Sequence, residues 1–523
     1  MALLSCVVGL VYILSRLRDI EMFYVFMDQR NHPQPFSLLT KICPFVAFFL
    51  DYLFVGEQVF FSLINRKYAT TRPSGRFGEI PFITVLIPCY DEPLEVIRDT
   101  TWAAANIHYP SEKFEVLLLD DMGATDRFEL VKELGSQFSN VKYKSRATEN
   151  KGPLPKRKGF KAGNLNFGIS EARPDTQGFL LLDADHVCKS EILHDLTPHG
   201  CDGGGNWDSQ FGFVQAPQSY QCQPWDSWDR TCREFHYVTQ AYRAYWNGVM
   251  LTGTSALVSA QALREVGLFD ESTVTEDILT GLKIHGRGYK GYYHPGDVAY
   301  GLIPVTFSSI LRQRLRWSQG SFQLLKKWWG LKAGLSIMQN LAYLSGIIYF
   351  LLGFAYMLLV LLPPLILLFN YDSSLHYSNI SILLLLGFIA SRYFSREIYC
   401  HKVTIEKSAG NYLGIVYSGV YIYAFFSALF SKRLVFHTTP KVAKDTGPQD
   451  SRLLFLEGLP LFLSLANLYA LCRIFYLSKF CDYPAKNFIT DYLGVTALAF
   501  YFFLCGLAPL IVSRSVQPRR AES

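Results

Sequence analysis

The stretch Leu180–Ser190, LLLDADHVCKS, places three apolar residues before two aspartates and a histidine. A short apolar run that ends abruptly in acids is typical of a buried strand in an open α/β sheet, where ligands bind at the carboxyl ends of strands. Asp183 and Asp185 would project to the same side of an extended strand and repel unless a proton or a divalent cation lay between them. With His186 nearby, these oxygen ligands suit Mg²⁺ or Mn²⁺, ions that usually hold substrate phosphates. A lone D-x-D can also simply cap a turn, so its context decides.

The segments that precede this stretch alternate between strand-like and helix-like patterns. Each strand-like run is apolar and ends in acids. This order predicts a nucleotide-binding α/β sheet. The segments are ITVLIPCYDEP (83–93) as a strand, EVIRDTTWAAANI (95–107) as a helix, FEVLLLDDMGATD (114–126) as a strand and KAGNLNFGIS (161–170) as the start of a helix.

The composition indicates membrane segments on both sides of this sheet. The chain has 523 residues, of which 50% are hydrophobic and only 18% charged. Most charges lie between about 65 and 335, whereas both flanks contain long runs with few charges. The net charge is only +6, and bases concentrate near the ends of the apolar runs. We interpret them as membrane anchors and expect no nucleic-acid partner.

Six apolar runs are candidate membrane spans. The second run contains Asp51 and Glu57, and we expect both to face other helices or a polar path. Pro363 and Pro364 should end or kink the third run. The runs are Ala2–Leu14 (a span or an interfacial anchor), Ile42–Ile64, 341–362, 375–391, 453–472 and 492–512.

A seventh apolar run, Tyr412–Phe430, is also just long enough to cross. If it crossed, eight Lys and Arg residues would lie in outside loops, against three if it lay in the interface. The positive-inside rule therefore favours an interfacial helix and leaves 431–452 in the cytosol.

Eight short motifs in a fixed order carry a resemblance to a known family. They are PCYDEP, LDDMGATD, KAGNLN, DADH, VQAPQ, GTSA, TED and QRLRW. The set resembles the processive family 2 glycosyltransferases, and most closely bacterial cellulose synthase catalytic subunits and related β-glucan synthases, over about residues 80 to 445. The resemblance implies a cytosolic α/β GT-A domain that binds a nucleotide sugar, inserted between about six transmembrane helices with interfacial helices, in a multi-pass plasma-membrane protein.

We expect four regions on this basis. They are 1–65, N-terminal transmembrane segments; 66–320, the cytosolic GT-A domain; 321–452, interfacial helices, spans and a gating-like loop; and 453–523, C-terminal spans and a short tail.

The resemblance also assigns a UDP-sugar donor site. It makes Asp183, Asp185 and His186 a site for Mg²⁺ or Mn²⁺ at the diphosphate, with Lys161 as a further diphosphate contact. The uridine contacts are Tyr90, Glu92 and Asp121, of which Asp121 reads uracil. Turn capping and a solvated helix start are the alternatives for these residues.

The motif Thr275-Glu276-Asp277 precedes a helix-like segment. By spacing alone, the two acids are favourable charges in a first helical turn. The match to the family motif TED makes Asp277 the expected catalytic base, with Glu276 beside it. Burial should raise the pKa of Asp277 and a nearby cation should lower it.

The Q-x-x-R-W match supplies two further expected donor-site residues, Gln313 and Arg316, and one acceptor-site residue, Trp317. Arg316 can pair with diphosphate oxygens, and Trp317 offers a flat face to a sugar ring at a channel entrance. An amphipathic interfacial helix with a Trp anchor is the other interpretation. The segment Gly253-Thr254-Ser255 and Gln215 are expected to line the acceptor site.

The segment LVFHTTPKVAK (434–444) partly resembles the family's gating loop F-x-V-T-x-K. Thr438 replaces the usual Val, and Lys441 would reach the diphosphate when the donor is bound. Two other departures are GLIPV (301–305) in place of the usual G-L-A-P-E and the expected absence of a C-terminal cyclic-di-GMP-binding domain. These departures leave the product linkage open.

The motif DADH looks more like that of β-glucan synthases and so favours UDP-glucose, and the resemblance to the family implies a polymer that leaves through the protein's own channel. A β-1,4 linkage is weakly preferred over β-1,3 or mixed linkage, and chitin or hyaluronan synthesis stays an alternative. A single-transfer enzyme that glycosylates a lipid is the nearest rival. A non-enzymatic transporter with a nucleotide-sensing domain is a third possibility. The expected partners are the donor, the growing polysaccharide and the lipid bilayer; accessory subunits and the oligomeric state are not predicted.

Overall fold

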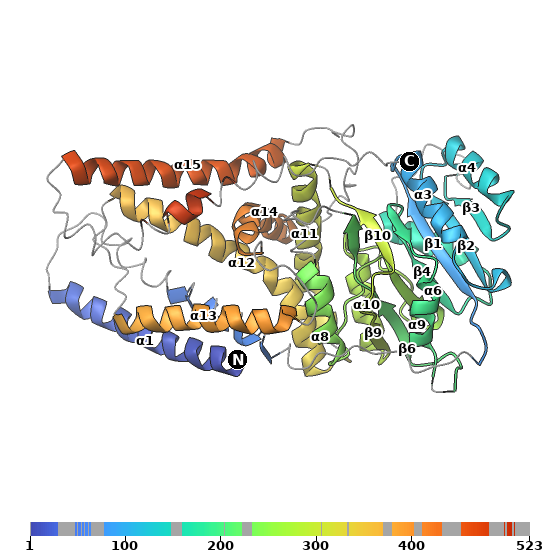
Figure 1. Cartoon of the computed structure of the whole chain (residues 1–523), viewed down its shortest axis with the longest axis horizontal. Helices are drawn as coiled ribbons and strands as arrows, with labels where there is room; N and C mark the ends of the chain where they lie inside the picture. The colour runs from blue at the N-terminus through green and yellow to red at the C-terminus, as the bar shows by residue number, and fades with distance from the viewer. Residues whose placement is uncertain are drawn as a thin grey trace. The chain divides into compact units, whose positions relative to one another are not determined.

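The computed structural model describes two compact units (Figure 1). The α/β unit comprises Lys67–Ile347, 424–447 and 516–523, and the helical unit comprises Met1–Arg66, Ile348–Tyr423 and Pro448–Ser515. The residues described are 2–29, 48–63 without 50, 54, 57 and 61, 78–147, 159–221 without 203, 233–331 without 305, 334–369, 379–401, 410–430, 451–480, 496, 499–504 and 507. The four regions expected from the sequence stay a prediction.

A seven-stranded mixed sheet forms the centre of the α/β unit, in the order β3-β2-β1-β4-β8-β6-β9. The first four strands in this order are parallel. Strand β8 is antiparallel to both of its neighbours, and β9 is parallel to β6. The strands are β1 (Ile83–Cys89), β2 (Phe114–Asp120), β3 (Val141–Ser145), β4 (Gly178–Leu181), β6 (Phe211–Gln215), β8 (Ala256–Ser259) and β9 (Lys290–Tyr293).

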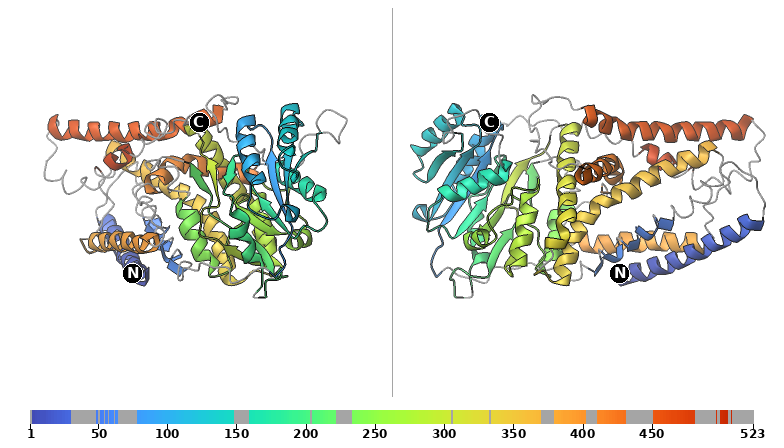
Figure 2. Two further views of the ribbon diagram at one scale, coloured as in Figure 1. Left: turned by 45° about the vertical axis from the view of Figure 1, so that its right-hand side comes forward. Right: turned by 180° about the vertical axis from the view of Figure 1, so that it is seen from behind.

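Helices cover both faces of this sheet, which explains why its strands read as continuous apolar runs. Val85 and Ile87 of β1 pack in one core with Ile97 of α3 (Leu94–Ala105). Leu86, between them, packs in a second core with Leu165 of α5 (Phe160–Glu171). The three layers are visible in Figure 2. The predicted α/β domain is therefore confirmed.

A second, three-stranded sheet lies next to the acidic motif. Its order is β5-β10-β7, with β5 at His186–Cys188, β10 at Ala299–Leu302 and β7 at Ser219–Gln221. Because β4 ends at Leu181, Asp183 and Asp185 lie on the connection between two strands. Our reading of them as neighbours on one extended strand is wrong.

The remaining elements of the α/β unit are mostly short helices. They are η1 (Ser111–Lys113), α4 (Thr125–Gly135), α6 (Ile192–Leu196), η2 (Thr197–Gly200), η3 (Glu234–Thr239), α8 (Gln240–Ala244), α9 (Ala260–Glu265), α10 (Glu276–Gly286) and α11 (Phe307–Leu331).

Long helices make up the described part of the helical unit. They are α1 (Ala2–Gln29), α12 (Ile337–Phe369), α13 (Asn379–His401), α14 (Gly410–Phe430) and α15 (Ser451–Phe480), with α12 and α14 each crossing the boundary between the units. Within the described residues, two stretches are long and apolar enough to cross a membrane, Ile337–Leu365 and Phe455–Leu477. The six expected spans are therefore not confirmed. Helix α12 continues through Pro363 and Pro364, so it does not end there, and the alternative of a kink at these prolines stays a prediction.

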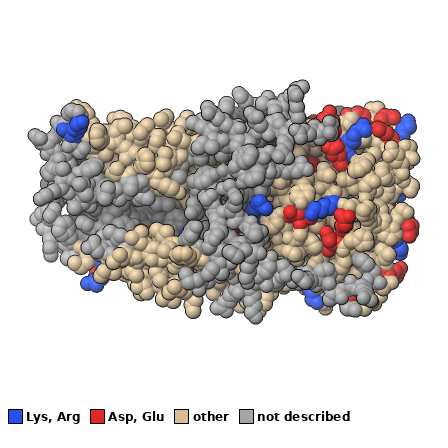
Figure 3. Space-filling view, in the orientation of Figure 1, with Lys and Arg blue, Asp and Glu red and all other residues tan. Residues whose placement is uncertain are grey.

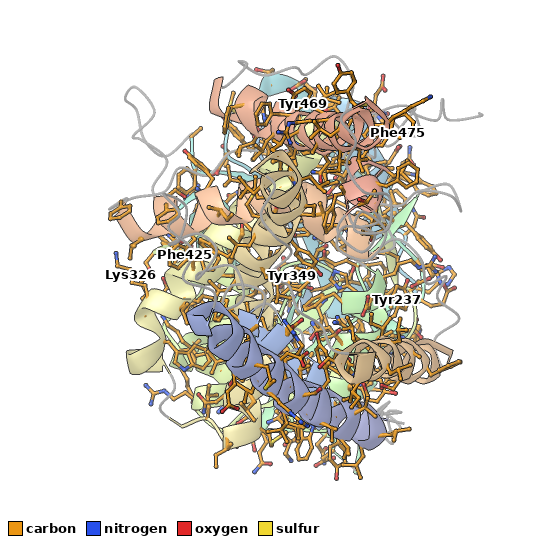
Figure 4. All side chains as sticks on the ribbon, turned by 90° about the vertical axis from the view of Figure 1, so that its left-hand side faces the viewer. Tyr237, Lys326, Tyr349, Phe425, Tyr469 and Phe475 are labelled. Atoms are coloured by element: carbon orange, nitrogen blue, oxygen red, sulfur yellow. The ribbon has the colours of Figure 1, made fainter. Side chains whose placement is uncertain are left out.

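The exposed side chains of the helical unit suit contact with lipid. Tyr469 and Phe475 of α15 are each 64% exposed (Figure 4). On the face shown in Figure 3, the described surface of the helical unit has few charged residues, whereas that of the α/β unit carries both signs. Asp51 is turned inward, where its Oδ2 accepts a hydrogen bond from Nε of Arg16 at 3.1 Å. The expectation that Asp51 faces other helices is confirmed, and Glu57 lies outside the described residues.

Candidate active site

A cavity of about 400 Å³ lies in the α/β unit, where strands β1, β2 and β4 end. It brings together side chains that are far apart in the sequence. The predicted site residues among its lining are Tyr90, Glu92, Asp121, Lys161, Asp183, Asp185, His186, Glu276, Asp277, Gln313, Arg316 and Trp317.

The connection after β4 forms an acidic cluster in this cavity. One ligand atom each from Asp183, Asp185 and His186 lie within 4.8 Å of one another. Nδ1 of His186 lies 3.2 Å from Oδ1 of Asp185. Nε2 of His186 is buried and has no hydrogen-bond partner among the described residues, and a side chain larger than that of Gly301 would collide with this ring. Two carboxylates and an imidazole with an open nitrogen fit a divalent cation such as Mg²⁺ or Mn²⁺.

Lys161, in the first turn of α5, places an ammonium group in the cavity. Its Nζ donates to Oδ1 of Asp183 at 2.5 Å and to the carbonyl oxygen of Gly253 at 2.9 Å. Burial alone would lower the pKa of Lys161, but the carboxylates of Asp183, Glu276 and Asp277 raise it overall. Lys161 is therefore charged at neutral pH and suits a diphosphate.

Glu276 and Asp277 occupy the first turn of α10, which begins after Thr275. The N-terminal end of a helix favours carboxylates because its free N–H groups carry partial positive charge. Burial, and then the charge of Asp277, raises the pKa of Glu276 to about 7. Burial also raises the pKa of Asp277, while Lys161 opposes this shift. A buried carboxyl, Glu276, beside a half-buried one, Asp277, both with raised pKa values and facing a cavity, is typical of a general acid–base site.

Helix α11 brings the Q-x-x-R-W residues to the same cavity. Gly320, one turn beyond Arg316 and Trp317, packs so closely on Thr275 that a Cβ at Gly320 would collide with the Thr275 side chain. The backbone N–H of Val274 also donates to Oε1 of Gln323 of this helix at 3.2 Å. The helix that carries the predicted acceptor platform is thus fixed against the loop that precedes the catalytic pair.

The predicted uridine contacts lie at the ends of β1 and β2. Oε2 of Glu92 accepts from the backbone N–H of Tyr90 at 2.7 Å. Burial, and then the charges of Asp185 and Asp183, raises the pKa of Glu92 to about 7.

Asp121 is buried and is held in place by a second side chain. Both of its carboxylate oxygens accept from Arg146, at 2.6 Å from Nε and 2.7 Å from Nη2. Burial raises the pKa of Asp121, and the Arg146 guanidinium opposes the shift. A carboxylate fixed in this way can accept a hydrogen bond in one defined direction.

Comparison with known proteins agrees with this geometry. The family model described as "Glycosyl transferase family 2" matches residues 84–267, and "Glycosyl transferase family group 2" matches 178–392. Residues 84–392 thus carry a family 2 glycosyltransferase region. The two matches together include every described site residue named above.

Two curated relatives of this glycosyltransferase are 30% identical to it. The cellulose synthase catalytic subunit (UDP-forming) of Xanthomonas axonopodis pv. citri matches over 326 residues, 60% of this chain and 41% of the relative. The cellulose synthase 1 catalytic subunit (UDP-forming) of Komagataeibacter xylinus matches over 281 residues, 52% of this chain and 35% of the relative. The chain thus spans about two fifths of these relatives' length. Among solved structures, a Pyrobaculum calidifontis mannosyltransferase in complex with GDP-Man and Mn²⁺ is 17% identical, with a TM-score of 0.49 over 74% of this chain and 99% of that one.

Three residues expected to line the acceptor site of the glycosyltransferase lie behind the cavity wall. Gln215, Thr254 and Ser255 are fully buried. Thr254 Oγ1 accepts from the backbone N–H of Asp183 at 3.0 Å, and Gln215 Nε2 donates to the carbonyl oxygen of Thr254 at 2.8 Å. Their acceptor role stays a prediction. Lys441, the predicted gating residue, lies outside the described residues.

The glycosyltransferase cavity also contains residues that we did not predict from the sequence. Tyr220 and Gln218 both line it, and the Tyr220 hydroxyl donates to Oε1 of Gln218 at 3.0 Å. The Tyr220 ring meets the ring of His186 edge-on, with centroids 5.8 Å apart. The motif VQAPQ contains Gln218, but only its first glutamine was singled out. Arg146 was not predicted because it directly follows β3, whereas its partner Asp121 directly follows β2.

Proposed function

We propose that this glycosyltransferase is membrane-embedded, inverting and processive, and that it polymerises a β-glucan from UDP-glucose. One observation carries the proposal. Twelve side chains expected from the family motifs, spread from Tyr90 to Trp317, line a single cavity. Donor-binding groups, a carboxylate pair and an aromatic platform in one cavity are the parts that sugar transfer to a hydroxyl requires.

The proposed mechanism begins with donor binding. Asp183, Asp185 and His186 would hold a divalent cation, which would supply positive charge to the diphosphate of the UDP-sugar. Lys161 and Arg316 bind the same diphosphate and stabilise the negative charge that develops when the sugar leaves. Asp121, held by Arg146, accepts a hydrogen bond from the base.

Asp277 is the proposed base. Its carboxylate takes the proton from the attacking hydroxyl of the terminal acceptor sugar, which rests on the ring of Trp317. Attack from the side opposite the diphosphate inverts the configuration at the sugar carbon. Glu276 lies beside the catalytic base Asp277. Burial and the charge of Asp277 raise the pKa of Glu276 to about 7, so the combined charge of this carboxyl pair changes near neutral pH.

Support for glucose comes from the DADH motif and from relatives named as UDP-forming cellulose synthases. A β-1,4 linkage is the weakly preferred product, with β-1,3- or mixed-linkage glucan, chitin and hyaluronan as alternatives. A single-transfer enzyme that glycosylates a lipid stays the main rival. Two helices long and apolar enough to cross a membrane, found among the described residues, support a membrane protein. Six spans, passage of the polymer through them, a cytosolic catalytic domain and the plasma membrane are part of the proposal.

The test is UDP release by the full chain in lipid nanodiscs with Mg²⁺ or Mn²⁺ and a panel of UDP-sugars. We expect UDP release with UDP-glucose and little with other donors. Preference for an N-acetylhexosamine or uronic acid donor would replace the glucan proposal by chitin or hyaluronan synthesis. Release that requires an added lipid acceptor and stops after one sugar would favour the single-transfer enzyme.

A further inference from the structure

Arg127, in the first turn of α4, connects the ends of two strands beneath the donor cavity. It is 7% exposed. Nη1 donates to Oδ1 of Asp120 and to the carbonyl oxygen of Tyr90, both at 2.7 Å, and Nη2 lies 3.3 Å from the carbonyl oxygen of Glu92. One guanidinium thus joins the loop after β1 to the end of β2.

Asp120, the partner of Arg127, accepts further hydrogen bonds from the loop after β2 and from β3. It is fully buried, and each of its carboxylate oxygens accepts two hydrogen bonds. Oδ1 accepts from Arg127 and from the backbone N–H of Met122, and Oδ2 accepts from the backbone N–H of Ala124 and from the hydroxyl of Tyr143. The loop that follows β2 is therefore fixed at two backbone positions directly after Asp121.

Neither Asp120 nor Arg127 belongs to the lining of the cavity, whereas Tyr90, Glu92 and Asp121 do. These three are the predicted uridine contacts. The ion pair between Asp120 and Arg127 therefore fixes the two loops, after β1 and after β2, that carry the predicted contacts to uridine.

We propose that Arg127 is a positioning residue for nucleoside recognition, which acts through the loops that carry Tyr90, Glu92 and Asp121. This inference rests on the proposed function. Only a planar guanidinium can donate in several fixed directions at once, so a lysine at this position keeps the charge but loses the simultaneous contacts. Tyr90, Glu92 and Asp121 are then no longer held in the relative positions that uridine requires. The catalytic pair on α10 and the acidic cluster after β4 stay in place.

The test compares Arg127→Lys with Arg98→Lys in the full chain. Arg98 is a matched control because it is also a helical arginine in a salt bridge, 3.2 Å from Glu133, but is 45% exposed and lies outside the cavity. We measure UDP binding by calorimetry, then KM and kcat with UDP-glucose. Arg127→Lys should weaken UDP binding and raise KM by about ten-fold each, with kcat changed by less than about three-fold. Arg98→Lys should match the parent protein.

A second variant keeps the test valid if Arg127→Lys fails to fold. Tyr143→Phe removes one hydrogen bond to Asp120 and should weaken UDP binding to a smaller extent at an unchanged thermal midpoint. Competition with CDP should show reduced discrimination between the two bases in both variants. Folded variants that bind UDP as the parent does, or that lose kcat alone, would overturn the positioning role. A parent protein that binds no uridine nucleotide would overturn the proposed function itself, and this inference with it.

Discussion

Gly253 lies directly against Asp277: a Cβ built on Gly253 would lie 2.7 Å from Oδ2 of the proposed base. The backbone of Gly253 has φ of +77°, a conformation that other residues rarely adopt, and its carbonyl oxygen accepts from Lys161. This glycine therefore borders both the base and the diphosphate-binding lysine. Its missing side chain gives Asp277 room to face the cavity.

Gly253→Ala should lower kcat by about 100-fold because the new methyl group displaces the base. Gly267→Ala is the control, since Gly267 has φ of +84° but no atom within 4 Å of its Cβ position. Both variants carry the backbone cost of about 1–2 kcal/mol for a left-handed residue. The rate of UDP release at saturating donor distinguishes them. Equal losses of activity would show that backbone strain alone, and not contact with Asp277, is responsible.

Gly320→Ala should reduce the transfer rate by about ten-fold, because its methyl group would push α11 away from Thr275 and move Arg316 and Trp317 with it. Gly135→Ala, at the end of α4, provides the matched helical substitution, since a Cβ there meets nothing within 4 Å. UDP release and the thermal midpoint would be measured for both. An active Gly320→Ala protein would mean that close packing of α11 on this loop is not required.

Transfer should depend on pH with an apparent pKa near 7, because burial and Asp277 raise the pKa of Glu276 to about that value. Below pH 7 the pair Glu276 and Asp277 retains one proton in most molecules. Fewer molecules then have both carboxyls ionised, the state in which Asp277 accepts a proton from the acceptor hydroxyl most readily. The rate at saturating donor should therefore fall as the pH drops from 8 to 6. In Glu276→Gln the pH at which the rate falls to half should shift to a lower value. In Glu92→Gln that pH should stay as in the parent protein. A flat profile between pH 6 and 8 in the parent protein would contradict the assignment.

Asp185→Asn should weaken binding of Mn²⁺, since it removes one of the three grouped ligands and leaves Asp183 and His186. We expect at least about a ten-fold increase in the Mn²⁺ dissociation constant, measured by electron paramagnetic resonance without donor. Asp99→Asn, an exposed substitution on α3, controls for the change in net charge. Identical Mn²⁺ titrations of the two variants would exclude the acidic cluster as the cation site.

The strand ends of this site can be predicted from the sequence because each is marked by a few consecutive residues. In β1 and β2 an apolar run stops at a proline, an acid or a turn, so the pattern itself marks where ligands can bind. The acids of α10 are equally visible because they begin a helix. The connection at Asp183 was misread as strand because the apolar run continues through Leu182, one residue beyond the end of β4.

The supporting residues could not be predicted in this way. Arg127 contacts the carbonyl oxygen of Tyr90, 37 positions earlier, and Arg146 meets Asp121 across 25 positions. No local periodicity tells which arginine will reach which strand end, because the contact depends on how the sheet is assembled. The membrane spans show a related limit, since apolar runs predict helices better than they predict how many of those helices cross.

The most direct test of the central claim is the product formed from UDP-glucose by the full chain in nanodiscs, compared with Asp277→Asn. Labelled glucose should appear in a long polymer that a β-1,4-glucanase digests. Asp277→Asn should form none while still binding UDP, because it removes the base and keeps the donor site. A polymer of unchanged yield from Asp277→Asn would contradict the assignment of the base, and a single transferred glucose in the parent protein would contradict processive synthesis.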